Sequence, residues 1–272
     1  MKKNKSLLLS APYILWMLLF TLIPLGVVAV YALTDPSTNE FSLVNIKNLG
    51  MFLPTIGVSI WYALISSVIC LLLGYPVAYY IAHRKPATQK ILYMLVMLPM
   101  CMSFLLRTLA WVGLLETTGI INRILGFVGI GPVSMIGTSG AVILGMVYNY
   151  LPYMILPLYA IIVKIDNRLI EAAEDLDCNS FNVFTRVVLP LSMPGILSGI
   201  TMVFVPAVST FYISQKLGGT DTMLIGDVIE RQFKSAQNPN LGAALSLVLM
   251  ILVFVCTGIM NRFGGDEEGV VV

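Results

Sequence analysis

Six long apolar stretches alternate with short polar segments along the 272 residues of this chain. The stretches cover about 7–33, 56–81, 91–115, 140–163, 196–213 and 241–260. A helix needs about 20 apolar residues to cross a bilayer, so each stretch predicts one membrane-spanning helix. The first is longer than the apolar core of a cleaved signal peptide, which is about 7–15 residues, and we expect it to remain as a span. The pattern predicts an all-α membrane protein, with residues 1–272 forming one transmembrane domain, a six-span helical bundle.

Two features of the spans predict how they bend and pack. Pro152 and Pro157 lie inside the fourth span, where proline removes a helical hydrogen bond and favours a kink. Gly195 and Gly199 are one helical turn apart near the start of the fifth span, and small residues at this spacing let helices approach closely. Two further long connections are predicted: residues 116–139 form a glycine-rich loop with one short helix, and residues 215–240 form a polar stretch.

The most polar connection, residues 164–190, has a helical pattern of its own. In its first half, apolar residues at helical spacing alternate with acidic ones: Leu169, Ile170, Ala173 and Leu176 against Glu171, Glu174 and Asp175. A second amphipathic helix is predicted over 180–188, and Asp177, Asn179 or Ser180 is placed to cap it. Pro190 and Pro194 then direct the chain back into the membrane. Because it contains the letters EAA at 171–173, we call residues 164–190 the EAA segment.

The composition supports a membrane protein and excludes several other classes. Hydrophobic residues make up 58% of the chain, charged residues 11%, and the mean hydropathy is +0.89, whereas soluble domains are about 25% charged. The sequence has no phosphate-binding loop of the form GxxxxGK[ST], its four cysteines lack metal-site spacing, and its single histidine, His83, has no partners for catalysis. We therefore expect no catalytic residues, no metal site, no cofactor bound by this chain and no nucleic-acid partner.

The distribution of basic residues predicts the orientation in the membrane. Of the 16 Lys and Arg residues, ten lie in the termini and connections on one side of the six predicted spans and six lie on the other side. The positive-inside rule then places both termini and the EAA segment in the cytoplasm. Two interpretations of this segment remain open, a connector lying on membrane lipid or a docking surface for a protein. Its acidic first helix favours a protein, because helices that lie on anionic lipid usually carry Lys and Arg.

The EAA segment resembles the EAA loop of ABC importer permeases. The residues that carry the resemblance are Glu171, Ala172, Ala173, Leu176, Phe184, Leu189, Pro190, Pro194 and Gly195. The stretches LLRTLAW, GMVYNYLPYMILPLYA and LGGTDTMLIGDVIERQF extend the likeness to spermidine/putrescine permeases of the PotB type. One position departs from the pattern: Asp177 stands where the family carries glycine at the corner, and Asp is among the residues that tolerate such a backbone.

This resemblance implies the MetI-like fold of type I importers, a location in the bacterial cytoplasmic membrane, and a set of partners. The partners are a second, PotC-like permease subunit, two PotA-like ATPase subunits that carry ATP and Mg, and an extracytoplasmic PotD-like polyamine-binding protein. The EAA segment would then couple ATP hydrolysis to transport. Phe181 and Phe184 are expected to anchor it to the ATPase, and Glu171 to orient it.

The substrate path is predicted at the outer end of the fifth span. Polycations need carboxylates and aromatic faces, and Phe211, Tyr212, Asp221, Asp227 and Glu230 supply such groups. A second interpretation is that the aromatic residues form a belt at the membrane interface and the acidic residues lie in a solvated loop. Two alternatives to polyamine import also remain open: an importer for another small solute such as iron or an oxyanion, and a channel or scaffold subunit without ATP coupling.

Overall fold

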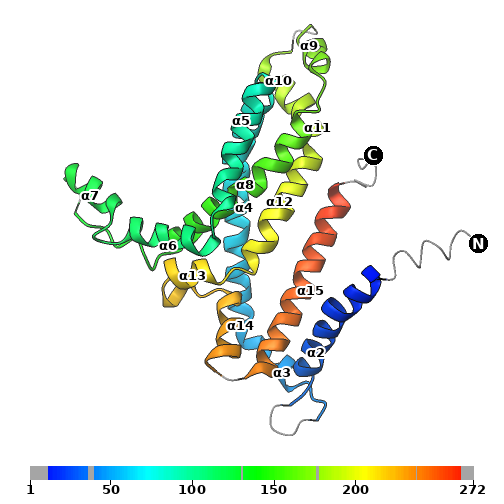
Figure 1. Ribbon diagram of the computed structural model, residues 1–272, viewed down its shortest axis with the longest axis vertical. Helices are drawn as coiled ribbons and strands as arrows, with labels where there is room; N and C mark the ends of the chain where they lie inside the picture. The colour runs from blue at the N-terminus through cyan, green and yellow to red at the C-terminus, as the bar shows by residue number, and fades with distance from the viewer. Residues whose placement is uncertain (1–11, 36–39, 130, 176–177, 237, 265–272) are drawn as a thin grey trace, which may run out of the picture. The chain divides into compact units, whose positions relative to one another are not determined.

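The structure, a computed structural model, describes residues 12–35, 40–129, 131–175, 178–236 and 238–264 (Figure 1). Within these ranges every regular element is a helix, apart from one isolated bridge between Thr34 and Phe41. Five helical stretches there are long and apolar enough to cross a membrane: Pro12–Ala32, Val44–Ala82, Phe104–Phe127, Ser139–Ile162 and Pro239–Met260. A bent pair, Ser180–Leu191 with Met193–Val208, makes a sixth if it is counted as one span. The chain divides into two compact units, Met1–Pro54 with Val228–Leu252, and Thr55–Asp227 with Val253–Val272.

The first unit is held together by two buried asparagines. Asn45 donates from Nδ2 to the carbonyls of Ala32 and Thr34, at 3.2 and 2.9 Å. Asn240 donates to the same Thr34 carbonyl at 2.7 Å. These bonds satisfy the carbonyls at the end of the first apolar helix, which no longer have helical donors. Besides the first two residues of α4 (Leu53–Ala82), the elements that lie in this unit wholly or in part are η1 (Leu18–Leu22), α2 (Ile23–Ala32), α3 (Val44–Asn48), η2 (Leu49–Phe52), α14 (Ile225–Lys234) and α15 (Pro239–Gly264).

The second unit is built on three long helices, α4 (Leu53–Ala82), α8 (Ser139–Ile162) and α12 (Met193–Val208). A Cβ placed on Gly199 of α12 would lie 2.6 Å from Sδ of Met154 on α8, so only glycine fits this contact unless Met154 moves. The small-residue spacing in the fifth span therefore marks a real helix contact, as predicted. The other helices of this unit are α5 (Pro86–Met97), η3 (Leu98–Cys101), α6 (Phe104–Leu115), α7 (Ile120–Phe127), α9 (Asn167–Asp175), α10 (Ser180–Val183), η4 (Phe184–Val188), α11 (Leu189–Leu191), α13 (Tyr212–Leu217) and η5 (Thr220–Thr222).

The prediction of one continuous span over 91–115 is wrong. Helix α5 ends at Met97, and the backbone is extended at Met102 and Ser103 before α6 begins. Pro99 has no N–H to continue the helical ladder, which explains a break at this point. Figure 1 shows α6 running across the direction of α5 rather than continuing it.

The fifth span, predicted over 196–213, has different bounds in the structure. Helix α12 begins three residues earlier, at Met193, and ends at Val208, and α13 is a separate short helix. The polar stretch predicted over 215–240 contains α14, which has Asp227 in its first turn and Arg231 and Lys234 in its last. Acidic residues at the start of a helix and basic residues at its end complement the helix dipole. The short helix predicted inside 116–139 is confirmed as α7.

Candidate functional site

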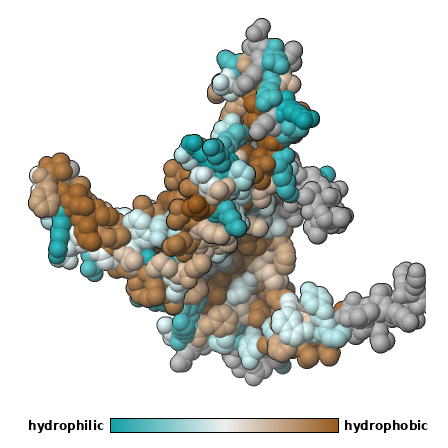
Figure 2. Space-filling view, turned by 45° about the horizontal axis from the view of Figure 1, so that its top comes forward, coloured by the Kyte–Doolittle hydropathy of each residue, from teal (hydrophilic) through white to brown (hydrophobic). Residues whose placement is uncertain are grey.

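The first helix of the EAA segment presents its acidic face to solvent. Helix α9 covers the first amphipathic helix predicted there, and its start is capped by Asp166, whose Oδ1 accepts from the Arg168 N–H at 3.0 Å. Glu171 and Ala172 are exposed, and Ala173 is half-buried. Figure 2 shows hydrophilic residues gathered at this end of the molecule. The predicted site residues Leu176 and Asp177 lie outside the described residues.

The second helix begins with a side-chain cap, as predicted. Asn179 is the residue that supplies it, with Oδ1 accepting from the Asn182 N–H at 2.8 Å. The helix does not end at 188 but passes through one turn of π-helix, η4, into α11. Val183 and Val188 are buried on its inner face, whereas Phe181 is 72% exposed. Of the two aromatic residues predicted to anchor this segment to a partner, only Phe181 has its ring largely free.

Phe184 packs against the chain's own α4. Its ring lies edge-on to Tyr75, with 5.5 Å between ring centroids, and edge-on to Tyr79 at 6.3 Å. Perpendicular aromatic pairs at these distances each contribute about 0.5–1.5 kcal/mol beyond the area they bury. Phe184 therefore fixes the EAA segment to the bundle and is not a free docking residue in this conformation.

A buried hydrogen bond holds the corner between the EAA segment and α12. The Tyr75 and Ser192 hydroxyls are 2.8 Å apart, and the Ser192 hydroxyl also lies 2.9 Å from the Leu189 carbonyl. Ser192 occupies the break between α11 and α12, where the helix axis bends by 64°. Pro190 is the second residue of α11 and directly follows the π-helical turn η4 and Leu189. Pro194 lies in the first turn of α12, a position where a missing N–H costs little.

The glycine after this corner brings α12 against α8. A Cβ on Gly195 would lie 3.1 Å from the Pro157 carbonyl oxygen and 3.1 Å from the Ile161 side chain. Leu189 is half-buried on the same side of the corner as the buried Val188. Of the predicted coupling residues that the structure describes, Phe184 and Gly195 pack against the bundle, and we call residues 184–195 the inner part of the site. Glu171, Ala172, Ala173 and Phe181 form its outer part.

The predicted substrate-path residues that the structure describes differ in exposure and in their contacts. Phe211 is 41% exposed, and Tyr212 packs on Phe104 at 6.3 Å between ring centroids. Asp227 is 4% exposed, and its Oδ2 accepts from the Leu224 N–H at 2.8 Å, which is the backbone group at the start of α14. Glu230 pairs with Lys234 one turn further along the same helix. The side chain of Asp221 lies outside the described part of the structure.

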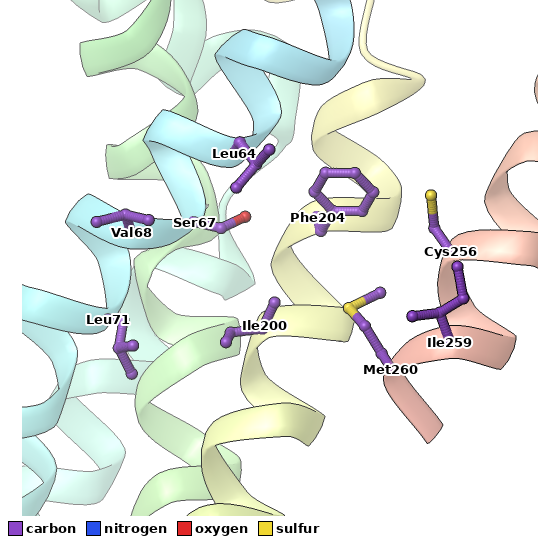
Figure 3. Close-up of a pocket in the computed structure, with 9 residues that line it drawn as sticks. All are labelled: Leu64, Ser67, Val68, Leu71, Ile200, Phe204, Cys256, Ile259 and Met260. Carbon is purple, nitrogen blue, oxygen red and sulfur yellow. The ribbon is translucent and has the colours of Figure 1, made fainter. Parts of the chain in front are cut away.

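A cavity of about 270 Å³ opens between α4, α12 and α15 in the second unit (Figure 3). Its lining is apolar except for Ser67, whose hydroxyl donates to the Ala63 carbonyl at 2.7 Å. A polycation needs carboxylates to replace its water, and this lining has none. The cavity is therefore unsuited to a polyamine. Its lining residues are Leu64, Ser67, Val68, Leu71, Ile200, Phe204, Cys256, Ile259 and Met260.

Two residues of the site, Tyr75 and Ser192, were missed by sequence reasoning. Ser192 carries a local signal, since it is the one hydroxyl between two prolines in LPLSMPGI. Tyr75 carries no comparable signal, because one tyrosine in an apolar span is as readily an interfacial residue. No group of three or more possible metal ligands occurs in the described part of the chain.

The chain is similar to known transport proteins in sequence and in fold. The chain is 41% identical to the spermidine/putrescine transport system permease protein PotB of Haemophilus influenzae, over 88% of this chain and 86% of that protein. It is 35% identical to the protein of the same name from Escherichia coli K12, over 88% and 90%. A bacterial alginate ABC transporter, crystallised with its alginate-bound periplasmic protein, has the same fold in one chain, with a TM-score of 0.77, 19% identity and coverage of 99% and 98%. Residues 71–264 match the family described as binding-protein-dependent transport system inner membrane component, and the chain belongs to that family of ABC importer permeases.

Proposed function

We propose that this chain is a transmembrane subunit of an ATP-driven importer for the polyamines spermidine and putrescine. The observation that carries the proposal is the 41% identity, over most of both chains, to a permease named for these substrates. This likeness favours polyamines over iron or oxyanions as the transported solute. The family match favours an importer over a channel or scaffold without ATP coupling.

The proposed complex contains a second permease subunit, two ATPase subunits and an extracytoplasmic polyamine-binding protein. ATP would be hydrolysed on the ATPase subunits, because this sequence has no phosphate-binding loop. The excess of basic residues on one side of the predicted spans supports an orientation with the EAA segment facing those ATPases in the cytoplasm.

In the proposed mechanism the outer part of the EAA segment docks on an ATPase subunit through Glu171, Ala172 and Phe181. Closure of the ATPases on ATP displaces the segment. The inner part transmits this displacement to the bundle, through Phe184 to α4 and through the corner at Ser192 to α12. Because the corner is hydrogen-bonded to α4 and packed on α8, we expect α4, α8 and α12 to move together as one body. This movement would open the transport path alternately to the two sides of the membrane.

Uptake by the purified complex tests the proposal. The four kinds of subunit are reconstituted in liposomes, and uptake of radiolabelled spermidine and putrescine is measured with ATP, without ATP, and with ferric or sulfate ions as competitors. We expect ATP-dependent uptake that unlabelled polyamine suppresses and the ions do not. Uptake that proceeds at the same rate without ATP would establish the channel alternative, and suppression by an ion would establish another substrate.

A further inference from the structure

Three exposed cations lie together where α4 turns into α5. Arg84 and Lys85 follow the end of α4, and Lys90 lies near the start of α5. No acidic residue occurs in the sequence between Glu40 and Glu116, so this part of the chain has only positive charge. We call residues 83–90 the basic turn.

The side chain of Gln89 gives the basic turn a defined shape. Its Nε2 donates to the carbonyls of Ala82 and Arg84, at 2.7 and 2.8 Å. Its Oε1 accepts from the hydroxyl of Tyr159 on α8 at 3.3 Å. These bonds hold the start of α5, with Lys90, beside the end of α4.

Arg84 is stacked on an aromatic ring at the end of α4. Its guanidinium carbon lies 4.0 Å from the centroid of the Tyr80 ring. Tyr80 is 53% exposed, and an exposed tyrosine near the end of a span is typical of the interface between membrane and water. An arginine stacked on a ring keeps its N–H donors, which match the oxygens of a phosphate. Arg84 is therefore oriented to bind an anion at that interface.

Exposed apolar side chains lead from the basic turn along both helices. On α4, Leu73 and Val77 are exposed at helical spacing from Tyr80, on the face that carries the stacked Arg84. On α5, Met94 is exposed one turn after Lys90. Helix α4 belongs to a stretch long and apolar enough to cross a membrane, and α5 lies against α8, which forms another (Figure 1). In a membrane these apolar side chains are covered by acyl chains.

We propose that the basic turn binds the headgroup of an anionic phospholipid whose acyl chains lie along the exposed apolar side chains of α4 and α5. One phospholipid matches both features, because its phosphate is joined to apolar chains, and basic clusters next to membrane spans bind anionic lipids. An acidic surface of an ATPase subunit would match the charge alone, since it does not reach the apolar side chains. The inference depends on the location in the membrane and not on the transported solute.

Photo-crosslinking of the full chain tests the proposal. The chain is reconstituted in phosphatidylcholine vesicles that contain a trace of phosphatidylglycerol with a diazirine in its acyl chain, and labelled peptides are mapped by mass spectrometry. Each basic residue near anionic lipid strengthens binding by about fivefold. We therefore expect residues 73–98 to be labelled about tenfold more than by phosphatidylcholine with the same diazirine. R84Q/K85Q/K90Q should remove this preference, whereas R84K/K85R/K90R keeps the charges and should retain at least half of it.

The matched control is K47Q/R123Q/K216Q, which removes three exposed positive charges elsewhere and should leave the preference unchanged. Because all the replaced side chains are exposed, each variant should keep the parental melting temperature. The proposal is overturned if the two lipids label equally or if the first glutamine variant keeps the preference. If that variant keeps the preference and recovers less ATPase subunit, the turn docks the ATPase instead. Suppression of labelling by an excess of inorganic phosphate also overturns it, since the turn would then bind the free ion. No substrate, ATP or partner is present, so a complex that imports no polyamine overturns the proposed function alone.

Discussion

The hydroxyl of Tyr75 lies 2.8 Å from the hydroxyl of Ser192, which is 117 residues further along the chain. Both side chains are buried, and Ser192 occupies the 64° bend between α11 and α12. The bond therefore joins α4 to the corner through which the EAA segment continues into the membrane. The structure thus connects α4, in addition to α12, to the end of the EAA segment, a connection that the sequence analysis did not predict.

Removing this bond should weaken coupling more than folding. We expect Tyr75→Phe and Ser192→Ala each to raise the amount of ATP hydrolysed per polyamine imported by proteoliposomes, about two- to fivefold. A buried hydrogen bond is worth about 0.5–1.5 kcal/mol, so the two changes in one chain should be non-additive by a similar amount. Ser209→Ala is the control, because Ser209 is the exposed C-cap residue of α12 and its hydroxyl donates to the Val205 and Pro206 carbonyls of that helix. Additive effects of the two substitutions would contradict a shared role.

The two phenylalanines of the EAA segment should behave differently. Phe184→Ala removes two edge-to-face ring contacts and should lower the free energy of unfolding by about 1–3 kcal/mol, seen as a lower melting temperature of the purified chain. Phe181→Ala removes a ring that is 72% exposed and should leave that temperature within a degree or two. Phe181→Ala should instead reduce the amount of ATPase that co-purifies with the chain. The reverse pattern would show that the exposed ring is not the docking residue.

Periodicity identified the long helices and the two short amphipathic ones, because these features depend on neighbours in the sequence. Gly195 and Gly199 were recognisable for the same reason, since their spacing is local. A break at Pro99 could have been predicted, because proline interrupts helices. The apolar residues on both sides of it nevertheless indicated one continuous span, so the change in direction was not predicted. The contacts of Tyr75 and Phe184 depend on which segments lie side by side, and one sequence does not contain that information.

Gly195 gives a direct test of the contact between α12 and α8. An alanine Cβ would lie 3.1 Å from the Pro157 carbonyl oxygen, a backbone atom that cannot turn aside. We expect Gly195→Ala to destabilise the purified chain by about 1–3 kcal/mol and to lower transport. Gly258→Ala on α15 is the matched control, because a Cβ there meets nothing within 4 Å. Equal melting temperatures of the two variants would show that α12 and α8 do not pack as closely as described.

Glu171 tests the outer part of the site. The residue is exposed, so Glu171→Ala should leave insertion in the membrane and the melting temperature unchanged. We expect at least a fivefold loss of polyamine uptake, with ATP hydrolysis that no longer responds to the loaded binding protein. Glu116→Ala provides a control with another exposed carboxylate outside the EAA segment. If hydrolysis in the Glu171 variant still rises normally with substrate, this carboxylate has no part in coupling.

Substitutions of Asp227 distinguish a structural role of its carboxylate from a role in binding the substrate. Its Oδ2 accepts from the Leu224 N–H at 2.8 Å, the arrangement by which an acidic residue in the first turn satisfies the backbone at a helix start. Asn keeps an oxygen acceptor at this position and loses the charge, whereas Ala loses both. We therefore expect Asp227→Asn to keep at least half of the parental uptake, and Asp227→Ala to destabilise the chain by about 0.5–2 kcal/mol. A carboxylate that binds a polycation would give a different ranking, because Asn would then abolish uptake while leaving the melting temperature unchanged. Uptake and melting temperature measured on the same three preparations distinguish these outcomes, since Asp and Asn have nearly the same shape and differ in charge and in one oxygen that becomes an NH2 group.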